Sequence, residues 1–416
     1  MIKETICMKE KKTSLTVTNN EVTAVLRSNI KKTGIRLYDN NCIGIAGAIG
    51  DYNDDELTKN AKGMLNFKVP YDAAPTENVK REMDLSKELA VSDEEFIAVS
   101  RKLLKELGKK YPMFVFRNKI DLIETEESLI NSVGTALTQK DRQINCTLLY
   151  KYKDSKNLMD GGGMYEARNM DYEQLFKAMS DSCEAYENKI DFAEKGETIP
   201  VVILGRIFNA LAKFYADLSA DSYANGASLF SGKAGEKLFS DKFSFLVNRD
   251  AMGTFSRFFD GEGIVLPGDC YNLIENGVLK TPYTTKRTAK QYNLPITGVA
   301  SMEYDSVPSA APLQLTVAKG DKTLKELLMG RKAIYIVMAS GGDFTPQGEY
   351  AAPIQAAYLY DGENYIGRLP QLSMSSNLYD MFGKDFIGLS SDSSYPGSPN
   401  NYLVFDMNVK KIDGWM

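Results

Sequence analysis

The chain has 416 residues, of which 43% are hydrophobic and 25% charged, and its formal net charge is −5. This composition is typical of a globular protein, and the length predicts two or three domains. Lysines and arginines form no basic run, which argues against nucleic-acid binding. The sequence contains no histidine, which excludes Ser-His-Asp and Cys-His catalysis and HExxH-type zinc sites.

The N-terminus and the cysteines favour a cytoplasmic protein that does not bind membranes. The segment MIKETICMKEKK lacks the apolar core of a signal peptide. No stretch approaches the roughly 18 consecutive apolar residues of a membrane span. The five cysteines are far apart and show no C-x-x-C spacing, so neither a disulfide framework nor a zinc knuckle is indicated.

The first fifty residues predict a short antiparallel meander. Apolar and polar residues alternate over residues 15–26, on both sides of the turn-prone pair Asn19-Asn20. A second pair, Asn40-Asn41, leads into the apolar segment CIGIAGAIG. A helix is expected from about Asp54, because apolar residues then recur at the spacing of one helix face: Leu57, Ala61 and Leu65.

A second helix is predicted to begin after Ser92. Ser92 and Glu95 have the spacing of a capping box, in which each side chain satisfies a free backbone amide. Val91 and Phe96 are placed to form a hydrophobic staple across the same helix start. Gly108 is expected to end this helix.

The remainder of the N-terminal half predicts two strands, a loop and a helix. The strands are expected at residues 112–116 and 145–152, and the loop at 160–163. The helix carries one apolar face, made by Leu175, Met179, Cys183 and Tyr186. The polar segment 187–199 predicts a boundary between a domain of residues 1–190 and a domain of residues 191–416.

The C-terminal half predicts a β-rich domain. The segment VVIL is followed by an expected amphipathic helix with Ile207, Leu211, Phe214, Tyr215 and Leu218 on one face. Short apolar runs then occur at residues 313–317, 333–339 and 354–360, in a Gly-, Pro- and Ser-rich context. The predicted fold class is α+β, with an N-terminal antiparallel sheet, flanking helices and a C-terminal β-rich domain.

The segment RFFDGEG, residues 257–263, places two acids between glycines. Asp260 and Glu262 could supply oxygen ligands to calcium or magnesium, but such sites normally need several carboxylates at defined spacing. A turn in which the glycines supply positive φ angles is the favoured interpretation. We expect Phe258 and Phe259 to anchor this loop to the β-rich domain.

Three further motifs have the residue types of catalytic or binding sites. The segment 160–163, DGGG, lacks the Lys-Ser/Thr of a phosphate-binding loop and is expected to be a mobile connection. A Ser-Lys pair could arise from Ser28 with Lys31, expected at a strand end, or from Ser231 with Lys233. The Cys270 thiol has no histidine to activate it. The residues alone therefore give no complete catalytic constellation.

Residues 257–293, 342–363 and 367–385 resemble the TldD/PmbA family, whose members are often called modulators of DNA gyrase. The first of these segments contains the acidic glycine loop, the hairpin sequence IENGVL and a threonine-rich T-x-x-TAK segment. A weaker resemblance covers the N-terminal meander and the segment near residue 54. The resemblance therefore extends over most of the chain.

The family has two arms. The TldD-like arm resembles a zinc metallopeptidase with an HExxxH helix, whereas the PmbA/TldE arm lacks this motif and partners the first. The corresponding positions in this chain contain no histidine and include Ser231, Gly232, Lys233, Gly235 and Glu236. A lone glutamate cannot hold zinc, so the resemblance is to the PmbA/TldE arm. It also implies that the acidic loop belongs to the common scaffold of the family: Arg257, Asp260, Gly261, Glu262 and Gly263.

The resemblance implies a non-catalytic subunit of a TldD/TldE-type metallopeptidase that processes or degrades unfolded or leader peptides. Such a chain would bind a TldD-like catalytic subunit and help to shape a peptide cavity. It would need no cofactor, since zinc is expected only in the partner. When isolated, the chain is expected to form a homodimer. Two alternatives stay open: a regulatory protein acting on gyrase, and a stand-alone hydrolase with Ser-Lys or carboxylate chemistry.

Overall fold

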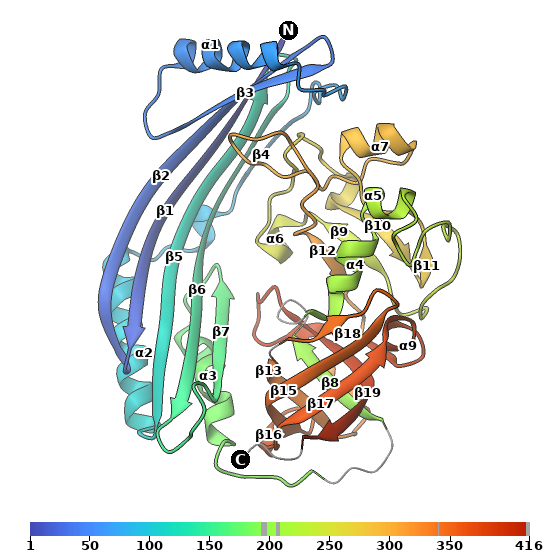
Figure 1. Ribbon diagram of the computed structural model, residues 1–416. Coiled ribbons are helices and arrows are strands. Elements are labelled where there is room, and N and C mark those ends of the chain that lie inside the picture. The colour runs from blue at the N-terminus through green and yellow to red at the C-terminus, as the bar shows by residue number, and fades with distance from the viewer. Residues whose placement is uncertain (193–197, 205–208, 340, 413–416) are drawn as a thin grey trace.

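The computed structural model describes residues 1–192, 198–204, 209–339 and 341–412. Figure 1 shows a long, curved sheet from the N-terminal half beside a β-rich C-terminal region. The predicted α+β class, with an N-terminal antiparallel sheet and flanking helices, is confirmed. The domain boundary between residues 190 and 191 stays a prediction.

The predicted N-terminal meander is confirmed, but its first two strands are long. Strands β1 (Ile2–Thr18) and β2 (Glu21–Asp39) pair along their whole length, and β3 (Cys42–Ile49) pairs with β2. Both asparagine pairs adopt positive φ angles, for example 50° and 65° in the first pair. These angles match the twist that two-residue hairpin turns need.

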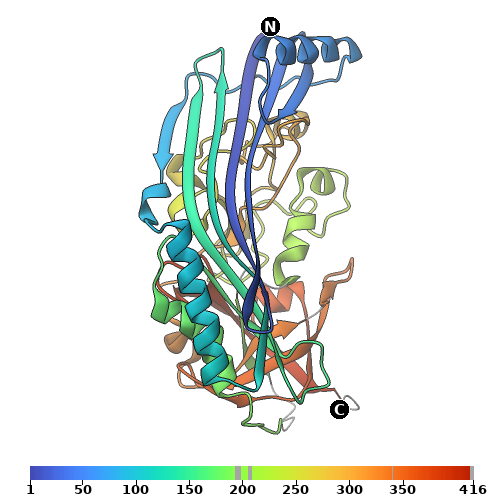
Figure 2. The same ribbon diagram turned by 90° about the vertical axis from the view of Figure 1, so that its left-hand side faces the viewer.

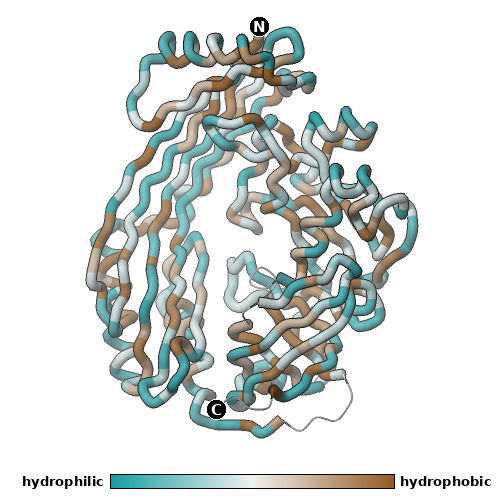
Figure 3. The backbone as a smooth tube through the Cα atoms, in the orientation of Figure 1, coloured by the Kyte–Doolittle hydropathy of each residue, from teal (hydrophilic) through white to brown (hydrophobic). Residues whose placement is uncertain are grey.

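The two strands predicted at residues 112–116 and 145–152 are the ends of much longer strands. Strand β5 (Phe114–Asn131) pairs with β1 on one side and with β6 (Ala136–Tyr152) on the other. The sheet order is β3-β2-β1-β5-β6-β4, and β4 is Lys80–Asp84. Figure 3 shows hydrophilic and hydrophobic residues alternating along these strands. This alternation is expected for an antiparallel sheet that packs against other elements on one face and meets solvent on the other.

Three helices flank this sheet, and all three were predicted. Helix α1 (Asp54–Met64) packs on β3, and helix α2 (Asp93–Lys110) lies across the outer face of the sheet in Figure 2. The Ser92 hydroxyl accepts a hydrogen bond from the Glu95 amide, as predicted. Helix α2 continues two residues past the predicted stop at Gly108. Helix α3 (Tyr172–Glu184) packs on α2 and on strand β7.

The prediction of a mobile connection at residues 160–163 is wrong. Gly161 begins strand β7 (Gly161–Ala167), which pairs with β6. Asp160 is buried and accepts hydrogen bonds from the Ser155 and Tyr186 hydroxyls. The glycines serve close packing, because a Cβ at Gly163 would lie 2.2 Å from the Ala178 carbonyl oxygen.

The C-terminal region contains an eight-stranded sheet in which five strands form a closed circuit of pairings. Strand β13 (Ala333–Ala339) pairs with β8 (Ile199–Leu204) and also with β15 (Glu349–Tyr360). The circuit continues from β15 through β17 (Leu372–Asn377) and β19 (Asn401–Lys411) back to β8. The remaining strands of this sheet are β14 (Asp343–Phe344), β16 (Tyr365–Arg368) and β18 (Phe386–Ser393).

A smaller sheet and several short helices complete this region. The sheet has the order β11-β10-β9-β12, and the predicted hairpin at IENGVL forms its β10–β11 turn at Asn276-Gly277. These strands are β9 (Phe245–Asn248), β10 (Cys270–Glu275), β11 (Val278–Leu279) and β12 (Leu315–Val317). The short helices are α5 (Ala220–Ala224), α6 (Ala251–Thr254), α7 (Lys286–Tyr292), α8 (Leu324–Leu328) and α9 (Leu378–Phe382).

The amphipathic helix expected after VVIL is shorter than predicted. A 3-10 turn (Asn209–Leu211) leads into helix α4 (Ala212–Asp217), and Ile207 lies outside the described residues. Phe214 of α4 packs at the centre of a phenylalanine cluster that includes Phe230, Phe243 and Phe382. In the part of the chain that the structure describes, no helix is both long and apolar enough to cross a membrane.

Candidate functional site

The RFFDGEG loop lies between the two halves of the molecule, where it contacts the N-terminal sheet. Phe258 and Phe259 are fully buried and share a hydrophobic cluster with Ile6, Leu129 and Leu137 of strands β1, β5 and β6. The same cluster contains Met302 of the C-terminal half, so the expected contact with the β-rich region is present but is only one side of the packing. They attach a loop of the C-terminal half to the N-terminal sheet.

The Asp260 carboxylate organises the backbone of the loop. Its Oδ1 accepts hydrogen bonds from the amides of Glu262 and Ile264, both at 2.9 Å, and its Oδ2 accepts one from Ala300. Asp260 is 0% exposed. A carboxylate whose oxygens already accept three amide bonds acts as the centre of a turn and is poorly placed to bind a metal.

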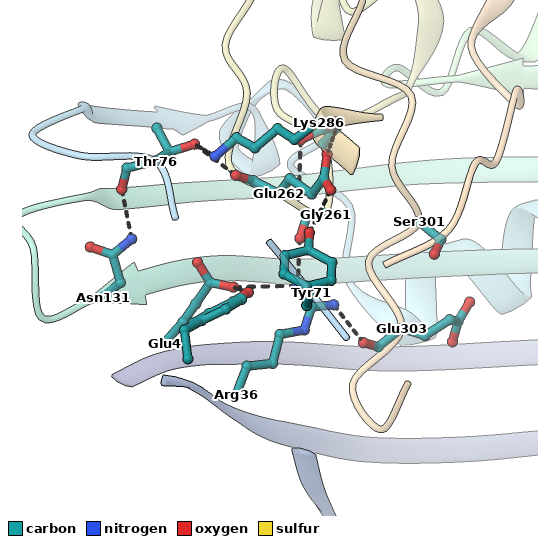
Figure 4. Close-up of polar contacts among 12 residues, drawn as sticks. Glu4, Arg36, Tyr71, Thr76, Asn131, Gly261, Glu262, Lys286, Ser301 and Glu303 are labelled. Carbon is teal, nitrogen blue, oxygen red and sulfur yellow. Dashed lines mark hydrogen bonds and ion pairs between the residues drawn. The ribbon is translucent and has the colours of Figure 1, made fainter. Parts of the chain in front are cut away.

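The Glu262 carboxyl is buried and holds the loop to two other segments. Tyr71 donates its hydroxyl to Oε1, and the backbone amide of Lys286 donates to Oε2 at 2.7 Å (Figure 4). Burial, together with the nearby Asp260 carboxylate, raises the pKa of Glu262 to about 7. Glu262 is therefore poised to change its protonation near neutral pH.

The Lys286 ammonium reaches across to the N-terminal half. Its Nζ donates to the Ala74 carbonyl at 2.9 Å and to the Thr76 hydroxyl at 2.6 Å. Thr76 in turn donates its hydroxyl to the Glu262 carbonyl. Burial lowers the pKa of Lys286, while the Glu262 and Asp260 carboxylates act against this change. These bonds join α7, the acidic loop and the segment before β4.

A buried ion pair on the N-terminal sheet continues the network. Arg36 of β2 is paired with Glu4 of β1 at 3.3 Å, and both side chains are at most 1% exposed. Arg36 also donates to the carbonyls of Gly261 and Glu303 (Figure 4). Gly261 must be glycine, because a Cβ there would lie 1.7 Å from the Ser301 carbonyl oxygen.

Two further arginines fix the ends of the loop. Arg249 is 1% exposed and donates to the carbonyls of Gly298 and Phe259, and burial lowers its pKa to about 10. Arg257 forms a short ion pair with Glu127 of β5. Gly263 adopts a φ of 73°, as the turn interpretation requires. The loop is thus a structural junction, and its polar groups bond to backbone and side chains of both halves.

Residues 231–236, where the resemblance places the lost zinc motif, form an exposed double turn. Gly232 and Gly235 have φ angles of 76° and 87°, and Glu236 is exposed. The Ser231 hydroxyl donates to the Tyr223 carbonyl, whereas the Lys233 ammonium donates to the Tyr379 hydroxyl. The two side chains of the candidate Ser-Lys pair are therefore engaged with different partners.

The other candidate nucleophiles lie apart from this region. Ser28 and Lys31 lie within β2, and not at a strand end as predicted, so they point to opposite faces of the sheet. Cys270 is exposed at the start of β10. Over residues 1–192, 198–204, 209–339 and 341–412, no group of three or more Cys, Asp or Glu residues is arranged to hold a metal ion.

The comparisons with known proteins identify the family. The family model described as the PmbA/TldA metallopeptidase C-terminal domain matches residues 196–411, which is more than half of the chain. The chain therefore belongs to the PmbA/TldD family. The metalloprotease MJ0996 of Methanocaldococcus jannaschii is 27% identical over 168 residues, which are 40% of this chain and 37% of that protein.

Solved structures share the fold over nearly the whole chain. TldE from Thermococcus kodakarensis superposes with a TM-score of 0.79 at 18% identity and covers 98% of this chain and 96% of its own. The protein TM0727 of Thermotoga maritima, which is named for DNA gyrase modulation, gives a TM-score of 0.78 with the same identity and coverage. At this identity the likeness concerns the fold alone.

The sequence drew attention to Asp260 and Glu262 but to none of their partners in the N-terminal half. Tyr71 lies 191 residues from Glu262, and Arg36 lies 225 residues from Gly261. No local pattern marks these residues, because each occupies an ordinary position in a strand or a connecting segment. Only the packing of the loop onto the sheet brings them together.

Proposed function

We propose that this chain is the non-catalytic, TldE-like subunit of a TldD/TldE-type metallopeptidase. The observation that carries the proposal is that the chain has no histidine, including at residues 231–236, the turn to which the resemblance assigns the zinc motif. Catalytic zinc sites normally use three protein ligands, most often histidines with a carboxylate or cysteine. Glu236 alone, exposed on this turn, cannot replace them.

The proposed partner is a TldD-like chain that carries the HExxxH motif and the zinc. The proposed substrates are unfolded or leader peptides, which reach the partner's active site in an extended form. Support comes from family membership and from metalloprotease-named relatives. The present chain then supplies binding surface, and its isolated form is proposed to be a cytoplasmic homodimer.

The experiment is co-expression of this chain with an HExxxH relative from the same genome. Zinc content and cleavage of an unfolded peptide are measured for each chain alone and for the copurified complex. We expect one zinc in the complex, none in the isolated chain, and chelator-sensitive cleavage by the complex. Stoichiometric zinc and chelator-sensitive cleavage in the isolated chain would refute the proposal.

A further arm of the same experiment tests the two alternatives. A pull-down from the native cell that recovers gyrase and no HExxxH relative would favour the regulatory protein. Peptide cleavage by the isolated chain that is lost in Lys233→Ala would favour the Ser-Lys hydrolase. We expect neither result, because Lys233 donates its hydrogen bond to Tyr379 and not to Ser231.

A further inference from the structure

A cavity of about 450 Å³ lies between the N-terminal sheet and the closed strands of the C-terminal region. One wall is formed by β7 and α3, and the opposite wall by β13 and the segment 394–402. Figure 1 shows β7 and β13 on the facing sides of these two halves. The volume lies within the range of ordinary ligand sites.

Strand β7 presents one unpaired edge to this cavity. Among the described strands, β7 pairs only with β6. At Glu166 the backbone amide and carbonyl turn away from β6 and meet the Tyr395 hydroxyl. Backbone groups alternate along an antiparallel strand, so those of Gly162 and Met164 point to the same edge. Both residues line the cavity, and Tyr395 closes one end of the edge.

The side-chain oxygens of two carboxamides on opposite walls lack hydrogen-bond partners. Gln174 Oε1 on α3 and Asn400 Oδ1 are buried, and neither meets a donor anywhere in the described chain. Asn400 is only 5% exposed. Most buried polar side-chain atoms in native proteins are hydrogen-bonded, and an exception beside a cavity is consistent with a partner that enters the cavity. Both residues line this cavity.

The rest of the lining suits an apolar group of variable shape. Methionine side chains are flexible and polarizable, and tyrosines offer broad apolar faces. The apolar residues of the lining include Met159, Met164, Met338, Tyr335, Tyr365 and Tyr402. Lys177 and Asp181 also line the cavity, but they form an ion pair with each other, so their charges neutralise one another. An uncharged occupant is therefore favoured.

We propose that this cavity binds an extended peptide segment, which pairs with the free edge of β7 at Gly162 and Met164 and places an apolar side chain between the methionines and tyrosines. A peptide supplies alternating N–H and C=O groups for the strand edge and polar groups for the two carboxamides. A purely apolar small molecule would leave all of these unpaired. The choice of a peptide as the ligand rests on the proposed function. The new element is the cavity where the peptide binds.

The test uses the full-length chain and a short fluorescein-labelled peptide of alternating leucine and threonine residues. Fluorescence anisotropy compares this peptide with a copy N-methylated at alternate residues, which keeps the side chains but removes the N–H groups of one edge. We expect the wild-type protein to bind the methylated copy at least about tenfold more weakly. Equal binding of the two peptides, or no binding of either, would overturn the proposal.

Two variants and a matched control locate the binding. Ala178→Phe fills the cavity from α3, and Ala98→Phe makes the same change at an exposed position of α2. Asn400→Leu removes a carboxamide whose oxygen has no partner in the described chain. We expect Ala178→Phe and Asn400→Leu to weaken peptide binding at least about tenfold, with an unchanged or higher melting temperature for Asn400→Leu, and Ala98→Phe to bind normally.

The outcomes separate this inference from the proposed function. If the complex contains zinc and cleaves peptides but neither cavity variant changes binding, the cavity proposal fails and the subunit role stands. If the cavity variants abolish binding by a chain that never joins an HExxxH partner, the binding site stands and the subunit role fails. Should Ala178→Phe fail to fold, Asn400→Leu decides the result.

Discussion

Replacing Glu262 by glutamine is expected to change how the stability of the protein depends on pH. Burial favours the protonated carboxyl and raises the pKa of Glu262 from 4.5 to about 7. The folded protein therefore holds this proton more tightly than the unfolded chain does. Stability from this group is fully present below pH 4.5 and is lost as the pH rises through 7.

The size of the effect follows from the two pKa values. A rise of the pKa from 4.5 to about 7 corresponds to roughly 3 kcal/mol, most of which is lost between pH 5 and pH 8. Glutamine cannot ionise, and it can accept from the Lys286 amide while donating to the Tyr71 hydroxyl. The free energy of unfolding of Glu262→Gln, minus that of the wild type, should therefore rise by roughly 2–3 kcal/mol between pH 5 and pH 8.

Urea unfolding followed by circular dichroism at several pH values between 5 and 8 measures the difference. Subtracting the wild-type curve removes the contribution of every other titrating group that behaves alike in both proteins. Glu236→Gln, at an exposed position, is the matched control and should run parallel to the wild type. Parallel curves for Glu262→Gln would refute the argument, because they would mean that Glu262 ionises alike in the folded and unfolded states.

Three further predictions concern the same junction and strand β7. Tyr71→Phe should lower the free energy of unfolding by about 1–2 kcal/mol, because it removes the hydrogen bond to Glu262. That bond favours the ionised carboxylate, so its loss should raise the pKa of Glu262 and move the pH-dependent loss of stability to higher pH. Urea unfolding at several pH values measures both effects. Arg249→Lys should cost about 2–3 kcal/mol in the same assay, because lysine cannot reproduce the guanidinium's bonds to two carbonyls. Gly163→Ala should lower the melting temperature, because the added methyl group clashes with the Ala178 carbonyl at a cost of about 1–3 kcal/mol. The control Gly63→Ala places its methyl group in open space on α1 and should stabilise the protein by about 0.5–1 kcal/mol.

Helices and hairpins were predictable because their signals are local. Ser92 caps α2 through a bond to an amide only three residues away, and each asparagine pair sets the φ angles of its own turn. The lengths of β1, β2, β5 and β6 were not predictable in this way. Their middle portions are rich in charged residues, and pairing with neighbouring strands extends them past the point where apolar alternation ends.

The glycines at 161–163 show why composition misled the sequence analysis. Glycine runs usually indicate a connection, but here each residue meets a close neighbour, such as the Tyr150 hydroxyl 2.3 Å from a Cβ at Gly161. The neighbour in each case comes from β6 or α3, so the reason for the glycine is visible only after folding. The same packing creates the cavity, and for that reason no sequence pattern identified Gln174 or Asn400.

The two contact regions between the halves of the molecule differ in how completely their polar groups are used. At the acidic loop, Glu4, Arg36 and Arg257 each leave one buried atom unpaired, but each is joined through another atom to a neighbouring charged group. At the cavity, the carboxamide oxygens of Gln174 and Asn400 have no partner in the described chain. A junction that only held the halves together would gain nothing from such groups, since each is costly to bury. Their presence beside a free strand edge favours the cavity, and not the acidic loop, as the place where a ligand completes the structure.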